Sequence, residues 1–341
     1  MTTPSSRAIE LHGAFGAQNL RVTPRPIAEP GPGEVLLRMR ACSLNYRDLR
    51  MIDGVYNPRQ PLPLVPLSDG VGEVLSLGSG VRDLKVGDRV MPCFAEGWLE
   101  GPPSRAKLAT TLGGPLPGVL AEHRITPAAA LVRAPAHLSD AEAATLPCAA
   151  VTAWHALVTE GQVKPGDRVL VQGTGGVSIF ALQFARMLGA EVMITSSSAA
   201  KLERARELGA SETVDYKKNP EWGKAVRAWS RGEGVDHVVE VGGAGTLDQS
   251  LRAVRPGGRI SVIGVLSGAV QPINIMPILM QQIRLQGIIV GSRAIFAEMC
   301  RGIEAARLHP VVDRVFALDE HQEALEHMRA GRHFGKVVIE L

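Results

Sequence analysis

The sequence has few cysteines and no pair of them at metal-binding spacing. The four cysteines among its 341 residues, Cys42, Cys93, Cys148 and Cys300, are far apart, and none belongs to a Cys-x-x-Cys pair. A structural zinc lobe needs closely spaced cysteines, and a disulfide framework needs cysteines in matched pairs. We therefore expect four reduced thiols and neither kind of cross-link.

An excess of charge and a long apolar run are also lacking. The formal net charge is +3, from 37 Lys and Arg against 34 Asp and Glu, and the two signs are interspersed. This balance argues against nucleic acid or an anionic membrane as a partner. No apolar stretch approaches the roughly 20 residues that span a bilayer, and residues 1–11 lack the basic and apolar regions of a signal peptide. We expect a cytoplasmic protein that acts on a small molecule.

One short apolar run, 169–172, enters a glycine-rich turn at 173–177 and continues as a helical pattern over 179–188. Such a turn directs backbone N–H groups and the positive end of the helix dipole at one point, which suits a pyrophosphate. Ser178 stands at the third glycine of G-x-G-x-x-G, so we expect weaker local packing and retained binding. The predicted dinucleotide-binding residues are Gly173, Thr174, Gly175, Gly176 and Val177.

Strand and helix patterns alternate after this turn. A strand pattern at 191–195 and a helical pattern at 201–208 come next, and further strand patterns lie at 236–241, 259–265 and 284–290. This alternation predicts an α/β fold with a doubly wound parallel sheet. The first third of the chain instead has short β patterns between Pro- and Gly-rich turns, which predicts a second, β-rich unit.

The end of the second predicted strand indicates which nicotinamide cofactor is bound. It reads Thr195-Ser196-Ser197-Ser198, with Lys201 nearby and without the carboxylate that would bind a ribose 2′-hydroxyl. Hydroxyl groups and an ammonium can bind a 2′-phosphate. Ser196, Ser197 and Lys201 therefore favour NADP(H). The open alternative is that the serines cap the next helix and Lys201 is a solvated surface residue.

Several motifs in order resemble the medium-chain dehydrogenase/reductase superfamily along essentially the whole chain. They are Gly-Pro-Gly-Glu-Val at 31–35, Lys-Val-Gly-Asp-Arg-Val at 85–90 and Phe-Gly-Lys-Val-Val-Ile at 334–339. The resemblance implies a GroES-like catalytic domain built from residues 1–147 and 291–341, a Rossmann NADP(H)-binding domain over residues 148–290, and a cofactor cleft at their junction.

The resemblance also makes missing zinc ligands informative. Alcohol dehydrogenases of this superfamily hold a catalytic zinc with a Cys in C-x-x-D, a His in G-H-E and a later Cys. The first two places carry Asn45 and Ser68 here, and only Cys148 keeps a ligand type. One thiolate cannot replace three protein ligands, so we expect no metal. Segment 94–120 lacks the cysteines of the structural zinc lobe, and it is either a cap over the cleft or a surface loop.

Without zinc, no Lewis acid stabilises an alkoxide while hydride leaves an alcohol. The chain is similar to the zinc-independent quinone and enone reductases of the superfamily, which implies hydride transfer from NADPH to an electrophilic quinone or α,β-unsaturated carbonyl. Two alternatives stay open. One is a metal-free alcohol dehydrogenase or carbonyl reductase, and the other is a non-catalytic NADPH-binding protein or sensor.

Candidate catalytic residues follow from the same resemblance. The Asn45 amide would donate to the substrate oxygen, or it would only stabilise a turn. Asp48 would orient its neighbours. Tyr56 stands where mitochondrial enoyl thioester reductases carry a proposed proton-donating tyrosine, and Tyr46 is a rival donor. Either tyrosine is equally suited to be an aromatic wall of the pocket.

On the cofactor side, Lys201 and Tyr216 match the residues that NADPH-dependent quinone reductases place around the 2′-phosphate. Thr152 matches a threonine near the nicotinamide, and its alternative is helix packing. Gly264 stands where the family lets the backbone approach the cofactor.

The last Rossmann strand pattern, 284–290, is apolar and therefore unfavourable as an exposed sheet edge. Relatives pair this edge across a two-fold axis, which implies a homodimer, whereas cover by the chain itself is the alternative.

Overall fold

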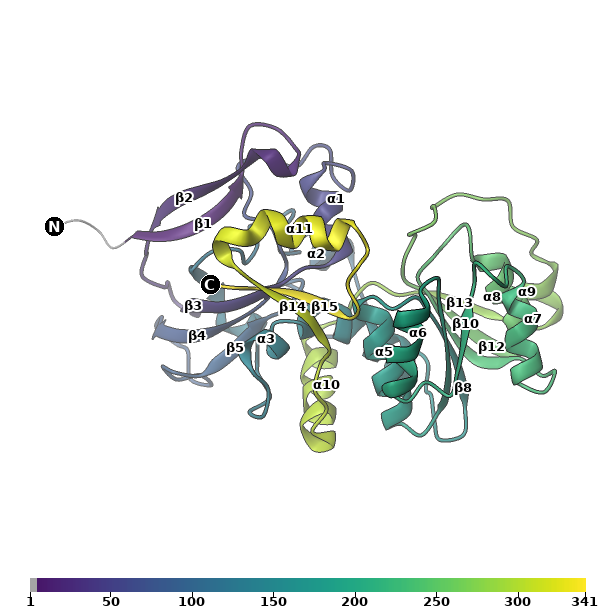
Figure 1. The fold of residues 1–341 in the computed structure, drawn as a ribbon. Coiled ribbons are helices and arrows are strands. Elements are labelled where there is room, and N and C mark those ends of the chain that lie inside the picture. Colours follow the sequence, from purple (N-terminus) through teal and green to yellow (C-terminus); the bar gives the residue numbers. More distant parts are fainter. Residues whose placement is uncertain (1–4) are drawn as a thin grey trace. The chain divides into compact units, whose positions relative to one another are not determined.

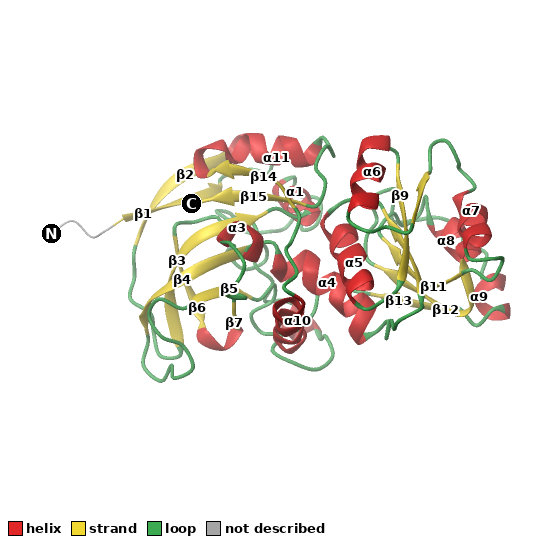
Figure 2. Ribbon diagram, turned by 60° about the horizontal axis from the view of Figure 1, so that its bottom comes forward, coloured by secondary structure: helices red, strands yellow, loops and turns green. Residues whose placement is uncertain are grey.

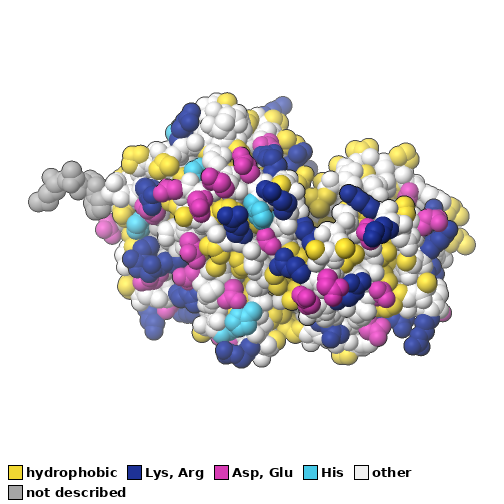
Figure 3. All heavy atoms as spheres, viewed as in Figure 1, with side chains coloured by type: hydrophobic (Ala, Val, Ile, Leu, Met, Phe, Trp, Pro, Cys, Tyr) yellow, Lys and Arg dark blue, Asp and Glu magenta, His cyan; other side chains and the backbone are white. Residues whose placement is uncertain are grey.

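The computed structural model describes residues 5–341 (Figure 1). The chain folds into two compact units: the described residues up to Val151 together with Gly291–Leu341, and Thr152–Val290. Within residues 5–341 no helix is both long and apolar enough to cross a membrane. On the face drawn in Figure 3, basic and acidic side chains are interspersed on each unit, and neither sign collects in one patch.

The first unit is built on a seven-stranded sheet, mostly antiparallel, in the order β14-β15-β3-β4-β5-β7, with β6 also paired to β3. Its strands are β3 (Glu34–Ser43), β4 (Asp69–Leu77), β5 (Arg89–Pro92), β6 (His123–Pro127), β7 (Leu131–Arg133), β14 (Val312–Ala317) and β15 (Lys336–Glu340). A separate antiparallel pair consists of β1 (Ser5–Leu11) and β2 (Leu20–Pro26). Alternate residues of β3 and β15, such as Leu37, Met39 and Ile339, enter one apolar core.

Strand β15 carries the end of the chain back to the beginning of the first unit. It pairs with β3 in antiparallel register, with Val338 opposite Ser43 and Ile339 opposite Cys42. The register places Lys336, the first residue of β15, beside the chain that leaves β3. The helices of this unit are α1 (Tyr46–Ile52), α2 (Arg105–Leu108), α3 (Asp140–Ala143), α10 (Arg293–Ala306) and α11 (His321–Arg329), with shorter turns η1 (Ala17–Asn19), η2 (Ala128–Ala130), η3 (Leu146–Ala150) and η5 (Leu318–Glu320).

The second unit contains a six-stranded parallel sheet in the order β10-β9-β8-β11-β12-β13. The strands are β8 (Arg168–Gln172), β9 (Glu191–Ser196), β10 (Glu212–Asp215), β11 (Val235–Glu240), β12 (Val254–Val262) and β13 (Arg284–Gly287). The chain runs outward from β8 to one edge, then returns to β11 and runs to the other edge. The topological switch point therefore lies between β8 and β11, where such sheets bind their ligands.

Helices cover both faces of this sheet (Figures 1 and 2). Helices α5 (Gly176–Met187) and α6 (Ala199–Glu207) lie on one face, and α7 (Trp222–Trp229), α8 (Leu247–Ala253) and α9 (Met276–Met280) lie on the other. The boundary between the units falls within α4 (Val151–Trp154), and η4 (His155–Thr159) follows it in the second unit. This architecture confirms the predicted fold class. The last strand is shorter than predicted and ends at Gly287, not at residue 290, and Val290 has a positive φ of 47° that no strand tolerates.

Candidate functional site

The predicted glycine turn joins β8 to α5. Gly173 has a φ of 71°, in the left-handed region that glycine adopts without strain. Gly175 is the N-cap of α5, and a Cβ added there would have no described atom within 4 Å. The space in front of this 12-residue helix can thus admit a phosphate group to the backbone N–H groups. The hydroxyl of buried Ser178 donates to the Gln172 carbonyl at 2.7 Å, so this position ties helix to strand more firmly than expected.

A residue that sequence reasoning missed organises the other side of the switch point. Glu240 ends β11, is fully buried, and accepts hydrogen bonds from Gln172 Nε2 at 2.7 Å and from the N–H groups of Gly242 and Gly243 at 2.8 and 2.9 Å. The hydroxyl of Thr246 also donates to it. The carboxylate therefore holds the loop after β11 against the end of β8. In the sequence, a single Glu at the end of an apolar strand and shortly before two glycines could have indicated this role.

The predicted 2′-phosphate residues gather at the carboxyl ends of β9 and β10. Ser196 is buried at the end of β9, and its carbonyl accepts the Tyr216 N–H at 3.2 Å, which brings Tyr216 to the same edge. The Ser198 hydroxyl caps α6 by accepting the Lys201 N–H at 3.4 Å. Of the three serines, Ser198 therefore has the helix-capping role that was the alternative to phosphate binding. Tyr216 is 40% exposed.

The remaining predicted cofactor residues also belong to the second unit. Ser197 is half-buried between β9 and α6, and Thr152 is buried in α4. A Cβ at Gly264 would lie 2.4 Å from the Val241 carbonyl oxygen. The chain's own backbone therefore demands glycine at position 264, a reason that differs from the expected approach of the cofactor. Contact of these residues with a cofactor stays a prediction.

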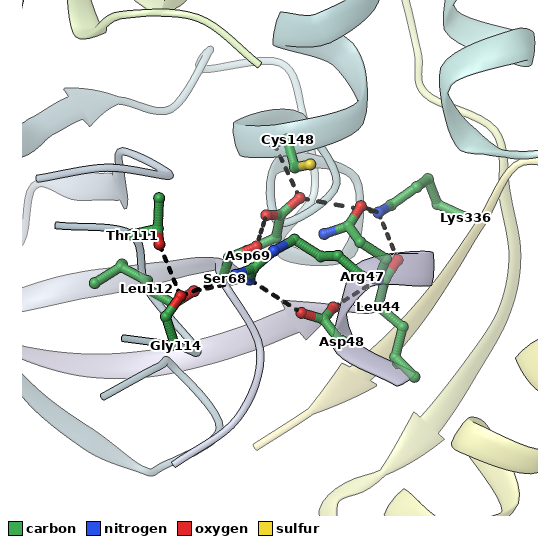
Figure 4. Close-up of polar contacts among 11 residues, drawn as sticks. Leu44, Arg47, Asp48, Ser68, Asp69, Thr111, Leu112, Gly114, Cys148 and Lys336 are labelled. Atoms are coloured by element: carbon green, nitrogen blue, oxygen red, sulfur yellow. Dashed lines mark hydrogen bonds and ion pairs between the residues drawn. The ribbon is translucent and has the colours of Figure 1, made fainter. Parts of the chain in front are cut away.

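In the first unit, the polar residues at the start of α1 form a buried network (Figure 4). Asn45 is the N-cap of α1, and its N–H donates to Asp48 Oδ2 at 2.7 Å. Lys336 Nζ donates to Asn45 Oδ1 and to the Leu44 carbonyl, each at 2.6 Å. Among the described residues, the buried Asn45 Nδ2 has no hydrogen-bond partner. The carboxamide oxygen is therefore occupied, whereas its buried NH2 group has no hydrogen-bond acceptor among these residues.

Asp69 connects the rest of the network. Its Oδ1 accepts the Ser68 hydroxyl at 2.7 Å, its Oδ2 accepts the Cys148 N–H at 3.0 Å, and Oδ2 lies 3.9 Å from Lys336 Nζ. Burial raises the pKa of Asp69, while Lys336, the hydrogen bond from Ser68, and Asn45 oppose this shift. The amide of Asn45 thus lies on the side that faces Asp69. The ion pair of Lys336 and Asp69 links three chain segments around Asn45.

Burial also shifts the protonation of two further groups. The pKa of Asp48 rises to about 6 because the carboxyl is fully buried, and the Arg47 guanidinium at 3.6 Å only partly opposes this. Burial and the charge of Asp69 raise the pKa of the Cys148 thiol. The thiol is therefore protonated at neutral pH.

The two candidate tyrosines lie close to each other but outside this network. Tyr46 is the first residue of α1 and 40% exposed, and Tyr56 lies in the loop after α1 and is 50% exposed. Partial burial and the neighbouring Tyr46 raise the pKa of Tyr56. Neither phenol makes a described hydrogen bond to Asn45 or Asp48, so the structure does not choose between the two proton donors.

Segment 94–120 is packed into the first unit near both of its ends, whereas residues 99–106 between them are exposed. Trp98 is 1% exposed, and its indole N–H donates to the Gly101 carbonyl at 2.8 Å. Arg47 donates to the carbonyls of Leu112 and Gly114 at 2.8 and 3.0 Å. These bonds fasten the segment to α1, beside Asn45 and Asp48.

The three positions of the zinc-ligand pattern do not form a zinc donor set. The Asn45 oxygen is bound to an ammonium and the Ser68 hydroxyl donates to Asp69, so only Cys148 keeps a zinc-ligand side chain. A catalytic zinc takes three protein ligands, each of which is a neutral His, a deprotonated Cys or a carboxylate. In the part of the chain that the structure describes, no three such side chains are placed to hold a metal ion. The residues present therefore do not fit zinc.

Comparison with known proteins gives concordant matches. The family model described as "Alcohol dehydrogenase GroES-like domain" matches residues 31–136, and the one described as "Zinc-binding dehydrogenase" matches residues 176–305. A zinc-type alcohol dehydrogenase-like protein of Schizosaccharomyces pombe is 46% identical over 316 residues, which is 91% of each chain. A 2-haloacrylate reductase of Burkholderia is 30% identical, over 97% of this chain and 98% of that protein. The solved structure of a candidate alcohol dehydrogenase from Sinorhizobium meliloti superposes with a TM-score of 0.94 at 42% identity, and covers 100% of both chains.

Proposed function

Because the chain belongs to the medium-chain dehydrogenase/reductase superfamily, we propose that it reduces a quinone or an α,β-unsaturated carbonyl compound with NADPH and without zinc. At the coarser level, the chain is an oxidoreductase of the alcohol dehydrogenase-like type, from a family that binds nicotinamide cofactors. The proposal concerns the acceptor, the choice between NADPH and NADH, and the metal.

One observation supports an acceptor whose oxygen becomes negative during reduction. Asn45 Nδ2 is a buried donor that has no hydrogen-bond partner within residues 5–341, next to the ammonium of Lys336 and in a network that does not fit zinc. Such a donor stabilises negative charge that collects on a substrate oxygen. It does not activate an alcohol as a metal ion does. The 2-haloacrylate reductase is named for reduction of an α,β-unsaturated acid, which also supports an activated double bond as the acceptor.

Each unit supplies a separate part of the reaction. The bound cofactor supplies a hydride for the electron-poor carbon of the substrate. In the second unit, the turn at Gly173 and the N-terminus of α5 hold the pyrophosphate, and Ser196 with Lys201 binds the 2′-phosphate. In the first unit, Asn45 Nδ2 donates to the substrate oxygen as that oxygen becomes negative. The proton that completes the reduction comes from Tyr46, Tyr56 or water.

The experiment that tests this proposal follows NADPH consumption with matched quinone, enone and aldehyde acceptors. It is run before and after metal chelation, and metal content is measured on the same sample. We expect turnover of the enone or the quinone by metal-free protein that the chelator does not change. Chelator-sensitive turnover would contradict the zinc-independent assignment.

The same panel separates the alternatives. Several relatives are named alcohol dehydrogenases, which favours a metal-free carbonyl reductase as the second candidate. Turnover of the aldehyde alone, with oxidation of a secondary alcohol in reverse, would support that candidate. Tight NADPH binding without turnover of any acceptor would support a non-catalytic NADPH-binding protein or sensor.

We further propose a homodimer that forms through the edge at β13. This strand pairs with β12 on one side and with no other described strand. The chain segment before it exposes many apolar side chains, namely Val265, Leu266, Val270, Ile273, Ile275, Met276, Leu279 and Met280. An open edge beside such a patch is an association surface, and a second copy with the same edge can complete the sheet across a two-fold axis.

A further inference from the structure

The first unit contains a buried ion pair that touches Asn45. The side chains of Lys336 and Asp69 are 3% and 0% exposed, and their charged atoms lie 3.9 Å apart. A buried pair of charges is usually no more stabilising than apolar residues of the same volume, because both ions lose their hydration. Stability alone is therefore a weak reason for this pair. Its contacts with Asn45 suggest a different role.

The contacts fix the orientation of the Asn45 carboxamide. One end of a carboxamide only accepts hydrogen bonds and the other only donates them. Oδ1 accepts a hydrogen bond from the Lys336 ammonium at 2.6 Å. The NH2 group lies close enough to Asp69 to lower the pKa of that carboxyl. A flipped carboxamide would set its NH2 group against the ammonium and its oxygen toward the carboxylate. Both charges of the pair oppose that flip.

We propose that the Lys336–Asp69 ion pair is a positioning device that holds Asn45 with Nδ2 as the available donor to the substrate oxygen. Neither charged group touches the substrate, and both act through Asn45. The device is assembled from distant parts of the chain, since Lys336 and Asn45 are 291 positions apart. The part that concerns the substrate rests on the proposed function, whereas the orientation of Asn45 does not.

Kinetics of a neutral double variant test the catalytic part. Lys336→Met together with Asp69→Asn removes both charges and leaves no unpaired buried ion, so the variant avoids the penalty of a single change. Removal of one preorganised donor lowers kcat by about 100-fold, which we expect for Asn45→Ala. Loss of orientation alone should lower kcat about tenfold in the double variant, with KM for the acceptor nearly unchanged.

A double-mutant cycle separates positioning from a merely structural role. If the pair acts through Asn45, its removal in the Asn45→Ala background should lower kcat less than about twofold further. The same tenfold loss in both backgrounds would overturn the proposal. Arg124→Met with Glu96→Gln is the matched control, because this ion pair of the first unit is also mostly buried, with side chains 10% and 12% exposed, and does not contact Asn45. It should lower the melting temperature without lowering kcat.

The orientation itself is testable without a substrate. In protein labelled with 15N at asparagine, the side-chain NH2 signals of Asn45 are identified by their loss in Asn45→Ala. We expect one sharp pair of signals in the wild type, and doubled or broadened signals in the neutral double variant. An unchanged sharp pair would overturn the inference. If the signals change as expected but the wild type reduces neither quinone nor enone, the proposed function fails and the positioning of Asn45 stands.

Discussion

At the scale of single residues, the chemistry of the first unit depends on a side chain that the sequence did not single out. Asn45 and Asp48 stand at positions of a family pattern, which makes them visible in the sequence. Lys336 was visible only as part of a motif in the last strand, although it is the lone charge before Val337, Val338 and Ile339. Its hydrogen bond with Asn45 decides which end of that carboxamide is occupied.

The proposed preference for NADPH depends most directly on Lys201. Its substitution by alanine should raise the Kd for NADPH about tenfold, or ~1.4 kcal/mol, because a charge-assisted contact with the 2′-phosphate is lost. The Kd for NADH should not change. Titration of both cofactors by fluorescence measures the two values. Lys224→Ala, on α7 at the other face of the sheet, is the control and should change neither. Equal affinity of the wild type for NADH and NADPH would contradict the assignment.

Asp48 makes stability depend on pH in an unusual direction. Its pKa is raised from 3.8 to about 6, so the folded state binds this proton more tightly than the unfolded chain does. The stability that this proton contributes is fully present below about pH 4 and is lost as the pH rises through about 6. Asp48→Asn should therefore gain stability relative to wild type across this window, by up to about 3 kcal/mol.

Urea unfolding of both proteins at several pH values between 4 and 8 measures this difference. The difference should grow between pH 4 and 6 and stay constant above pH 7. A difference that is constant over the whole range would show that the Asp48 carboxyl titrates alike in the folded and unfolded states.

At the scale of elements, the β8-α5 turn shows how a departure from a glycine motif is accommodated. Glycine at the third motif position lets a helix pack closely on its strand. Here Ser178 is 2% exposed and its hydroxyl binds the Gln172 carbonyl. The serine therefore replaces close packing with a hydrogen bond between the same two elements.

Restoring the motif should therefore destabilise this protein. Ser178→Gly loses the hydrogen bond, about 1 kcal/mol, and adds the cost of glycine within a helix, up to about 1 kcal/mol. Affinity for NADPH should stay the same, because the position faces the strand. Chemical denaturation and cofactor titration provide the two readouts. Ser178→Ala removes only the hydrogen bond, so its free energy of unfolding should lie between those of the wild type and Ser178→Gly. Stabilisation by Ser178→Gly would refute this account.

At the scale of the whole molecule, the apolar segment before β13 predicts association. Leu279 and Met280 are 68% and 72% exposed, and they belong to a larger group of exposed apolar side chains in this segment. Such a patch indicates a surface that binds another protein molecule. Glutamate at both positions should convert a dimer into a monomer, because two charges would be buried at the interface. Sedimentation velocity measures the change. Val86→Glu, which alters an exposed apolar residue of the other unit, is the control and should leave the dimer intact. A wild type that sediments as a monomer would refute the dimer.

Sequence patterns were sufficient to predict the parallel sheet of the second unit and the place of its glycine turn. Local patterns sufficed there, because strand β9 and helices α5 and α6 each carry their own periodicity and end signals. The end of the last strand was predicted wrongly, since the backbone conformation of Val290 depends on its surroundings. The contact between Lys336 and Asn45 depends on tertiary structure. Strand β15 pairs with β3 and brings Lys336 to Asn45, and no local pattern encodes a contact between residues 291 positions apart.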